Sequence, residues 1–126
     1  MRIWDIPPEK LCRHHLFGEH SEQHAIWSIL TRNKKGFSHH PETIRRKGKL
    51  QTLYLRHQGV VKEMLRCGMK HNSTMNKLLA TGLDYQDESV DSINREKKIL
   101  KNKSCKCDIG AEPWYNWPFL AYQANS

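Results

Sequence analysis

Apolar residues recur every three or four positions through most of the first 100 residues, and no stretch alternates convincingly between apolar and polar. A spacing of three to four is typical of amphipathic helices, whereas strands alternate with a period of two. We therefore expect an all-α fold. The clearest helix is predicted over residues 49–67, and its apolar side consists of Leu50, Leu53, Tyr54, His57, Val61, Met64 and Leu65. The cations of this segment lie off that side: Lys49, Arg56, Lys62 and Arg66.

A second long helix is predicted over residues 14–31. Its buried side is expected to comprise Leu16, Ala25, Ile26, Ile29 and Leu30. Shorter elements are predicted before and after these two helices: a helical turn after Pro7-Pro8, another within residues 42–49, a short helix at 72–79 and a last helix at 92–103. Residues 84–91 carry four acids and no bases, which predicts a solvated loop. The aromatic, proline-containing tail at 104–126 is expected to be irregular.

The chain has 126 residues, a length typical of one domain, and we expect a single domain over 1–126. Its formal net charge is +8: residues 1–77 hold 15 Lys/Arg against 6 Asp/Glu, and residues 78–126 hold 6 against 7. Such an uneven positive charge indicates a polyanionic partner, nucleic acid first. No apolar run approaches the roughly 20 residues of a membrane span, and the N-terminal segment does not resemble a secretory signal. We expect a cytoplasmic monomer that binds no membrane.

Three polar residues of the predicted 14–31 helix share one side. At 100° per residue, His15, Glu19 and Glu22 fall within about 60°. Two carboxylates and an imidazole on one stripe are not what a packed core would select for stability. The α-amine of Met1 adds a second candidate group, because its usual pKa of about 7.7–8.0 leaves it partly neutral near pH 8. These groups together could form an amine nucleophile with a general acid/base.

A metal site is a weaker alternative. His20 and His24, four residues apart on a helix, could ligate zinc together with Cys105 and Cys107. The spacing matches no common structural zinc motif, so we expect no metal and no cofactor. The terminal aromatics could stack on unpaired bases or pack against the helices, and composition favours packing.

Residues that suggest a family lie mostly within the first 70 positions. They are Met1-Arg2-Ile3-Trp4, Leu11, His15-Leu16, Glu19, Glu22, the loop KGFSHHP at 35–41 and LRCGM at 65–69. Together they resemble the pyrimidine-dimer DNA glycosylase, or phage endonuclease V, family and its bacterial and archaeal relatives. Trp114-Tyr115-x-Trp117 is similar, more loosely, to the aromatic C-terminal segment of the phage enzyme.

The resemblance implies an all-α fold whose N-terminal segment is threaded between helices and brings the terminal amine to a catalytic glutamate. By position, Met1 takes the place of the nucleophile and Glu22 that of the glutamate, with Arg2 and His15 as adjoining polar contacts. In that family the amine attacks C1′ of the damaged nucleotide, the resulting imine releases the base, and β-elimination cuts the strand. We therefore expect a DNA glycosylase/apurinic-site lyase acting on double-stranded DNA at pyrimidine dimers or abasic sites.

Six further residues are expected to contact DNA. Arg13, Arg45 and Arg46 are candidate phosphate contacts, and Trp114, Tyr115 and Trp117 are candidate base contacts.

The sequence also departs from the phage enzyme. Ser21 and Ala25 stand where that enzyme has arginines, and Arg2 is bulky, so Met1 is expected to be retained and to supply the amine. These departures leave an alternative open, a non-catalytic DNA-binding domain of the same fold.

Overall fold

The computed structural model of this protein describes residues 2–71 and 73–102, and all regular structure in those residues is helical. The elements in chain order are η1 (Pro8–Lys10), α1 (Arg13–Thr31), α2 (Pro41–Ile44), α3 (Leu50–Arg66), η2 (Lys77–Leu79) and α4 (Ile93–Lys101). The predicted all-α class is therefore confirmed. Met1, Cys105, Cys107 and the aromatic residues Trp114, Tyr115 and Trp117 lie outside the described residues.

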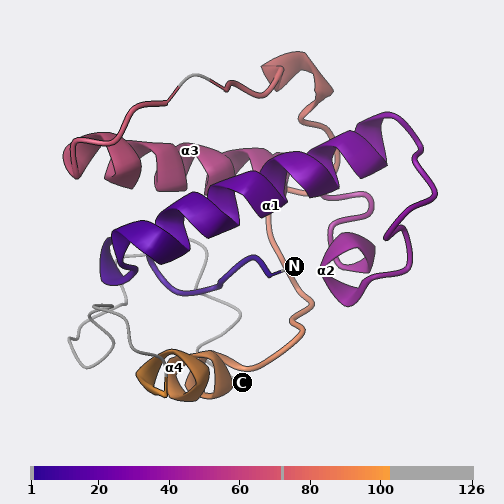
Figure 1. Cartoon of the computed structure of the whole chain (residues 1–126). Helices are drawn as coiled ribbons and strands as arrows, with labels where there is room; N and C mark the ends of the chain where they lie inside the picture. The colour runs from indigo at the N-terminus through magenta and orange to yellow at the C-terminus, as the bar shows by residue number, and fades with distance from the viewer. Residues whose placement is uncertain (1, 72, 103–126) are drawn as a thin grey trace.

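The two long helices form the centre of the molecule. α1 and α3 pack side by side and run in opposite directions (Figure 1). The start of α1 is tied to the end of α3. Nη1 of Arg13, the first residue of α1, donates to the carbonyl of Cys67, just past α3, at a distance of 2.5 Å. α3 ends at Arg66, one residue before its predicted end. Gly68, just past this end, has a φ of +78° that suits glycine, and the Met69 N–H closes the helix by bonding to the Met64 carbonyl.

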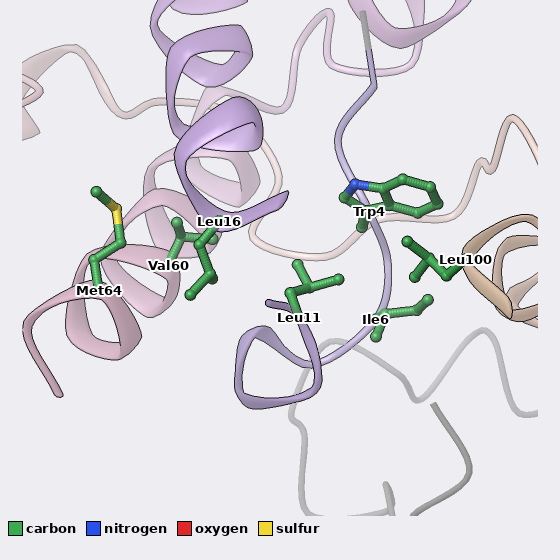
Figure 2. Packing of buried hydrophobic residues seen from close by; sticks show 7 residues of the cluster. All are labelled: Trp4, Ile6, Leu11, Leu16, Val60, Met64 and Leu100. Carbon is green, nitrogen blue, oxygen red and sulfur yellow. The ribbon is translucent and has the colours of Figure 1, made fainter. Parts of the chain in front are cut away.

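The N-terminal segment 3–6 is extended and lies between α1 and α4 (Figure 1). Trp4 and Ile6 belong to a buried cluster (Figure 2). Its other members come from the residue after η1, from both long helices and from α4: Leu11, Leu16, Val60, Met64 and Leu100. Ile3 belongs to the neighbouring cluster with Ile26, Trp27, Leu53 and Met75. Burying an apolar side chain of this size contributes roughly 1.5–3 kcal/mol. The segment is thus a central part of the core.

Several expectations about single positions were wrong. Leu65 is 57% exposed and Ala25 is exposed, whereas Lys49 and Arg56 are buried. The two cations are buried because each meets an acidic partner from a distant part of the chain, which the spacing along one helix does not report.

Two segments also differ from their predicted structure. The predicted helix at 72–79 is reduced to η2, which is capped by the Asn76 side chain. The acidic stretch 84–91 is only partly solvated: Gln86 is buried, and Asp87 pairs with Lys49 at 2.5 Å. No helix in the described part of the chain is long and apolar enough to cross a bilayer.

Candidate active site

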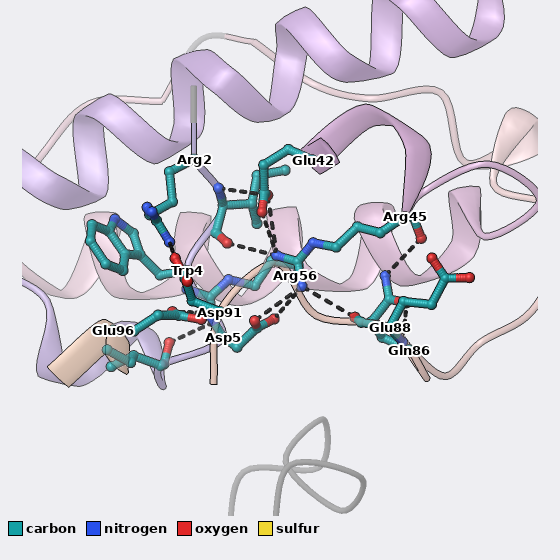
Figure 3. Close-up of polar contacts among 12 residues, drawn as sticks. Arg2, Trp4, Asp5, Glu42, Arg45, Arg56, Gln86, Glu88, Asp91 and Glu96 are labelled. Atoms are coloured by element: carbon teal, nitrogen blue, oxygen red, sulfur yellow. Dashed lines mark hydrogen bonds and ion pairs between the residues drawn. The ribbon is translucent and has the colours of Figure 1, made fainter. Parts of the chain in front are cut away.

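The backbone of the N-terminal segment is held by charged side chains in place of a neighbouring strand (Figure 3). Three consecutive N–H groups donate to carboxyl oxygens from three different helices: Ile3 to Glu42 Oε2 (2.9 Å), Trp4 to Glu19 Oε1 (3.1 Å) and Asp5 to Glu96 Oε1 (2.8 Å). Buried N–H groups need an acceptor, and a charged acceptor gives a stronger bond than a neutral one.

Two carbonyl groups of the same segment are held by arginines. Ile3 accepts from Nη2 of Arg45 at 2.8 Å, and Ile6 accepts from Nη1 of Arg56 at 2.7 Å. Both guanidiniums are buried. The chain is therefore fixed by four separate elements to within two residues of its α-amine.

Glu19 and Arg56 form the best-satisfied ion pair of this group. Both Glu19 oxygens accept from the guanidinium, at 2.7 and 2.8 Å, and the carboxylate is closed off by Gln23 at 2.5 Å. Burial alone would lower the pKa of Arg56, but the charge and hydrogen bonds of Glu19 raise it. Removing one member of such a pair leaves a buried, unpaired charge, at a cost of about 3–5 kcal/mol.

Arg45 and Arg46 lie inside the protein, each with 3% exposure. Arg45 pairs with Asp5 and Glu42, both at 3.0 Å, and Arg46 donates to the Thr52 hydroxyl. Burial and the neighbouring Arg45 lower the pKa of Arg46 to about 10. Neither guanidinium is open to a phosphate in this arrangement, so the expected DNA contact has no support from their placement.

Asp5 and Glu96 form a carboxyl pair that shares a proton. Burial and the charge of Asp5 raise the pKa of Glu96 to about 10, so Glu96 is protonated at neutral pH. Burial alone would raise the pKa of Asp5, but Arg45, the hydrogen bond with Glu96, and Arg46 lower it. The ionised Asp5 and the neutral Glu96 attach α4 to the N-terminal segment.

Glu22 has a different environment from Glu19, although both lie on α1. It is half-buried and lines a groove of about 520 Å³ between α1 and the loop after it. Lys34 and the exposed ring of Phe37 lie on the loop side of this groove. A second groove, of about 420 Å³, adjoins the first at Lys34 and is also lined by Lys35 and Lys47. An open carboxylate therefore lies close to a group of exposed cations.

The other predicted site residues are placed as follows. Arg2 bonds to Asp91 at 2.9 Å, and its guanidinium lies 5.1 Å from the Trp4 ring centroid. His15 is buried edge-to-face against Trp4, with Nδ1 3.2 Å from Cys12 Sγ. Arg2 and His15 therefore both contact one residue, Trp4. Arg13 is exposed, and the bond to Cys67 engages one of its nitrogens.

Comparison with protein families gives a match to the model described as pyrimidine dimer DNA glycosylase, over residues 1–77. The chain belongs to this family. The match spans the N-terminal segment and the helices α1, α2 and α3, which carry most of the charged contacts to that segment. Searches of curated proteins and of solved structures found no match.

Three residues that hold the N-terminal segment in place were not predicted as site residues. Glu42 and Glu96 anchor the N-terminal backbone, and Arg56 completes the pair with Glu19. The one available signal for Glu42 was an acid at the start of an otherwise basic stretch, ETIRRKGK. Glu96 gave none, because it lies in a helix of mixed charge like any exposed glutamate.

Four histidines that make none of these contacts to the N-terminal backbone form a cluster of their own. His20 and His24 come from α1, His57 from α3 and His71 from the segment after α3, and their ligand atoms all lie within 4.8 Å of one another. Burial and the neighbouring histidines lower the pKa of His20 and His57 to about 4, partly offset by the Ser73 backbone and, for His57, by Gln58. Sequence reasoning considered the first two histidines but paired them with Cys105 and Cys107, which lie outside the described residues.

Proposed function

We propose that the protein is a DNA glycosylase/apurinic-site lyase in which the α-amine of Met1 is the nucleophile and Glu22 the general acid/base. The amine attacks C1′ of the damaged nucleotide, and the base leaves with the electrons of its bond to C1′. The nitrogen then gives up its protons and forms an imine with C1′ as the C1′–O4′ bond of the sugar ring opens and O4′ takes a proton. Removal of a C2′ proton then expels the 3′ phosphate by β-elimination. Glu22 can hold or transfer the sugar protons in both steps.

The observation that carries the proposal is the anchoring of residues 3–6 by buried carboxyl and guanidinium groups. Such groups are costly to desolvate, so they rarely surround an ordinary chain end. The segment also runs against the direction of α1: Ile6 packs with Leu16, Trp4 bonds to Glu19, and Ile3 packs with Ile26. Glu22 lies on α1 between Glu19 and Ile26, the two positions that meet Trp4 and Ile3.

The test is covalent trapping on abasic-site duplex DNA with borohydride, which reduces the imine to a stable amine. Protein with an authentic N-terminus should give a covalent complex, and peptide mapping should find the adduct on Met1. An N-terminal extension should abolish trapping, because its amine is displaced from the anchored segment. The same extension at the C-terminus is the matched control. An adduct on a lysine, or trapping that survives the N-terminal extension, would refute Met1 as the nucleophile.

DNA binding without catalysis is the second candidate, favoured by positions 21 and 25. Ser21 is exposed and its hydroxyl bonds to the Phe17 carbonyl of its own helix, and Ala25 is also exposed. Neither supplies the cation found at these positions in the phage enzyme. Salt-dependent duplex binding with no trapping on any residue would favour this candidate.

A further inference from the structure

The histidine cluster of His20, His24, His57 and His71 has the geometry of a metal site. Nε2 of His57 lies 3.3 Å from Nε2 of His20 and 3.2 Å from Nε2 of His24. With Zn–N bonds of about 2.0–2.1 Å, neighbouring nitrogens of a tetrahedral zinc site lie about 3.3–3.4 Å apart. These two separations agree with that edge length, and all four ligand atoms lie within 4.8 Å of one another.

Hydrogen bonding within the cluster does not explain the convergence. Nδ1 of His57 lies 2.8 Å from the amide oxygen of Gln58, so Nδ1 carries the proton and Nε2 presents its single lone pair. One lone pair cannot accept two good hydrogen bonds, one from Nε2 of His20 and one from Nε2 of His24. His71 Nε2 is buried and has no hydrogen-bond partner among the described residues. Buried polar atoms without partners are rare and call for an explanation such as an ion.

We infer that these four histidines bind one divalent transition metal ion, zinc first among them, in a closed tetrahedral site. Imidazole nitrogen is a ligand suited to zinc, copper, iron and nickel, and four protein ligands with no open position are typical of structural zinc. The Gln58 contact is the kind of outer partner that usually orients a ligating histidine.

The site would act as a structural clamp. It joins α1, α3 and His71, which lies beyond the end of α3 and outside regular structure. His57 is fully buried, whereas His20, His24 and His71 are partly exposed, so an ion could enter from the side of those three. The site includes neither Glu22 nor any side chain that holds the N-terminal backbone. It does not depend on the proposed glycosylase activity.

The test uses the full chain without a polyhistidine tag, stripped of metal and titrated with Co²⁺ and then Zn²⁺. One equivalent of Co²⁺ should give the intense visible absorption of tetrahedral cobalt, and one equivalent of Zn²⁺ should remove it and raise Tm. His71→Ala and His24→Ala, both at partly exposed positions, should each weaken Zn²⁺ binding by about 100-fold or more, and Gln58→Ala by the roughly 10–100-fold typical of an outer partner.

His39→Ala is the matched control, because His39 is exposed on the loop before α2 and lies outside the cluster. It should bind Zn²⁺ like the unchanged protein. Circular dichroism of each metal-free variant separates loss of a ligand from loss of the fold, and the two ligand variants test the site independently. Absence of one-to-one binding, an octahedral cobalt spectrum, or equal affinity in the His71 and His39 variants would overturn the inference.

Discussion

At the scale of single residues, Glu19 and Glu22 differ in environment although they are three residues apart on one helix. Glu19 is 2% exposed and bonds to Arg56, Gln23 and the backbone of Trp4. Glu22 is half-buried on a groove with Lys34. A carboxylate that has satisfied all its hydrogen-bonding capacity supports structure, whereas an open one is available for proton transfer.

This difference gives a prediction for isosteric substitutions. Glu22→Gln should leave the free energy of unfolding and duplex affinity nearly unchanged and should lower strand cleavage at abasic sites by about 10²–10⁴-fold, the range of general acid/base catalysis. Glu19→Gln should instead lower the free energy of unfolding by about 3–5 kcal/mol, because it leaves Arg56 buried and unpaired. Urea unfolding and cleavage assays on both variants measure this. Full cleavage activity in Glu22→Gln would contradict its catalytic role.

At the scale of elements, helices α1, α2 and α4 each contribute one carboxyl group to the N-terminal backbone. The contact from α4 is sensitive to pH, since the pKa of Glu96 is raised from 4.5 to about 10 by burial and by Asp5. Between these two values the folded protein keeps a proton that the unfolded chain releases. The free energy of unfolding therefore falls as pH rises through this window, by at most about 1.4 kcal/mol per pH unit.

Glu96→Gln tests the docking of α4. A glutamine amide keeps the neutral shape, can accept from the Asp5 N–H and can donate to its carboxylate, but it cannot ionise. The unchanged protein should lose stability between pH 6 and pH 9, and the variant should lose clearly less. Urea unfolding at both pH values makes the comparison. The lowered pKa of Asp5 acts only below its usual value of 3.8 and does not interfere. Equal pH dependence in the two proteins would mean that Glu96 is ionised when folded.

At the scale of the whole molecule, the positive charge available to DNA differs from the charge counted in the sequence. Arg45, Arg46, Lys49 and Arg56 are buried with polar or acidic partners, so they add little to the surface field. Three exposed lysines line the two grooves on this side of the molecule: Lys34, Lys35 and Lys47. Lys34 lies in both grooves and shares one of them with Glu22. We expect this face to meet the phosphate backbone.

Salt dependence of duplex binding tests that face. The slope of log affinity against log salt is about −0.9 per phosphate neutralised, so Lys34→Ala with Lys35→Ala should make it shallower by about two units. Lys98→Ala with Lys101→Ala, two exposed lysines of α4, is the matched control and should leave the slope unchanged. Fluorescence anisotropy from 50 to 200 mM salt measures both. Equal slopes for the two double variants would place the DNA surface elsewhere.

The sequence by itself determined the helical class, the two long helices and the family. Spacing of apolar residues reports which side of a helix is buried, and this located α1 to within one residue at its start and α3 to within one residue at each end. The MRIW terminus, the helix with His15, Glu19 and Glu22, and the loop at 35–41 carried the family resemblance. Local patterns suffice here because helices form from neighbouring residues and short motifs keep their chemistry together.

Only the tertiary structure decided which charged residues are interior. Arg45, Arg56 and Glu96 look like exposed helix residues, since the partners that make their burial tolerable are about 40 to 90 positions away in the chain: Asp5 for Arg45, Glu19 for Arg56, and the Asp5 backbone for Glu96. The histidine cluster was hidden for the same reason, because His71 reaches His20 only when α1 and α3 pack. Burial of a charge depends on pairs brought together by folding, and spacing along one helix does not contain that information.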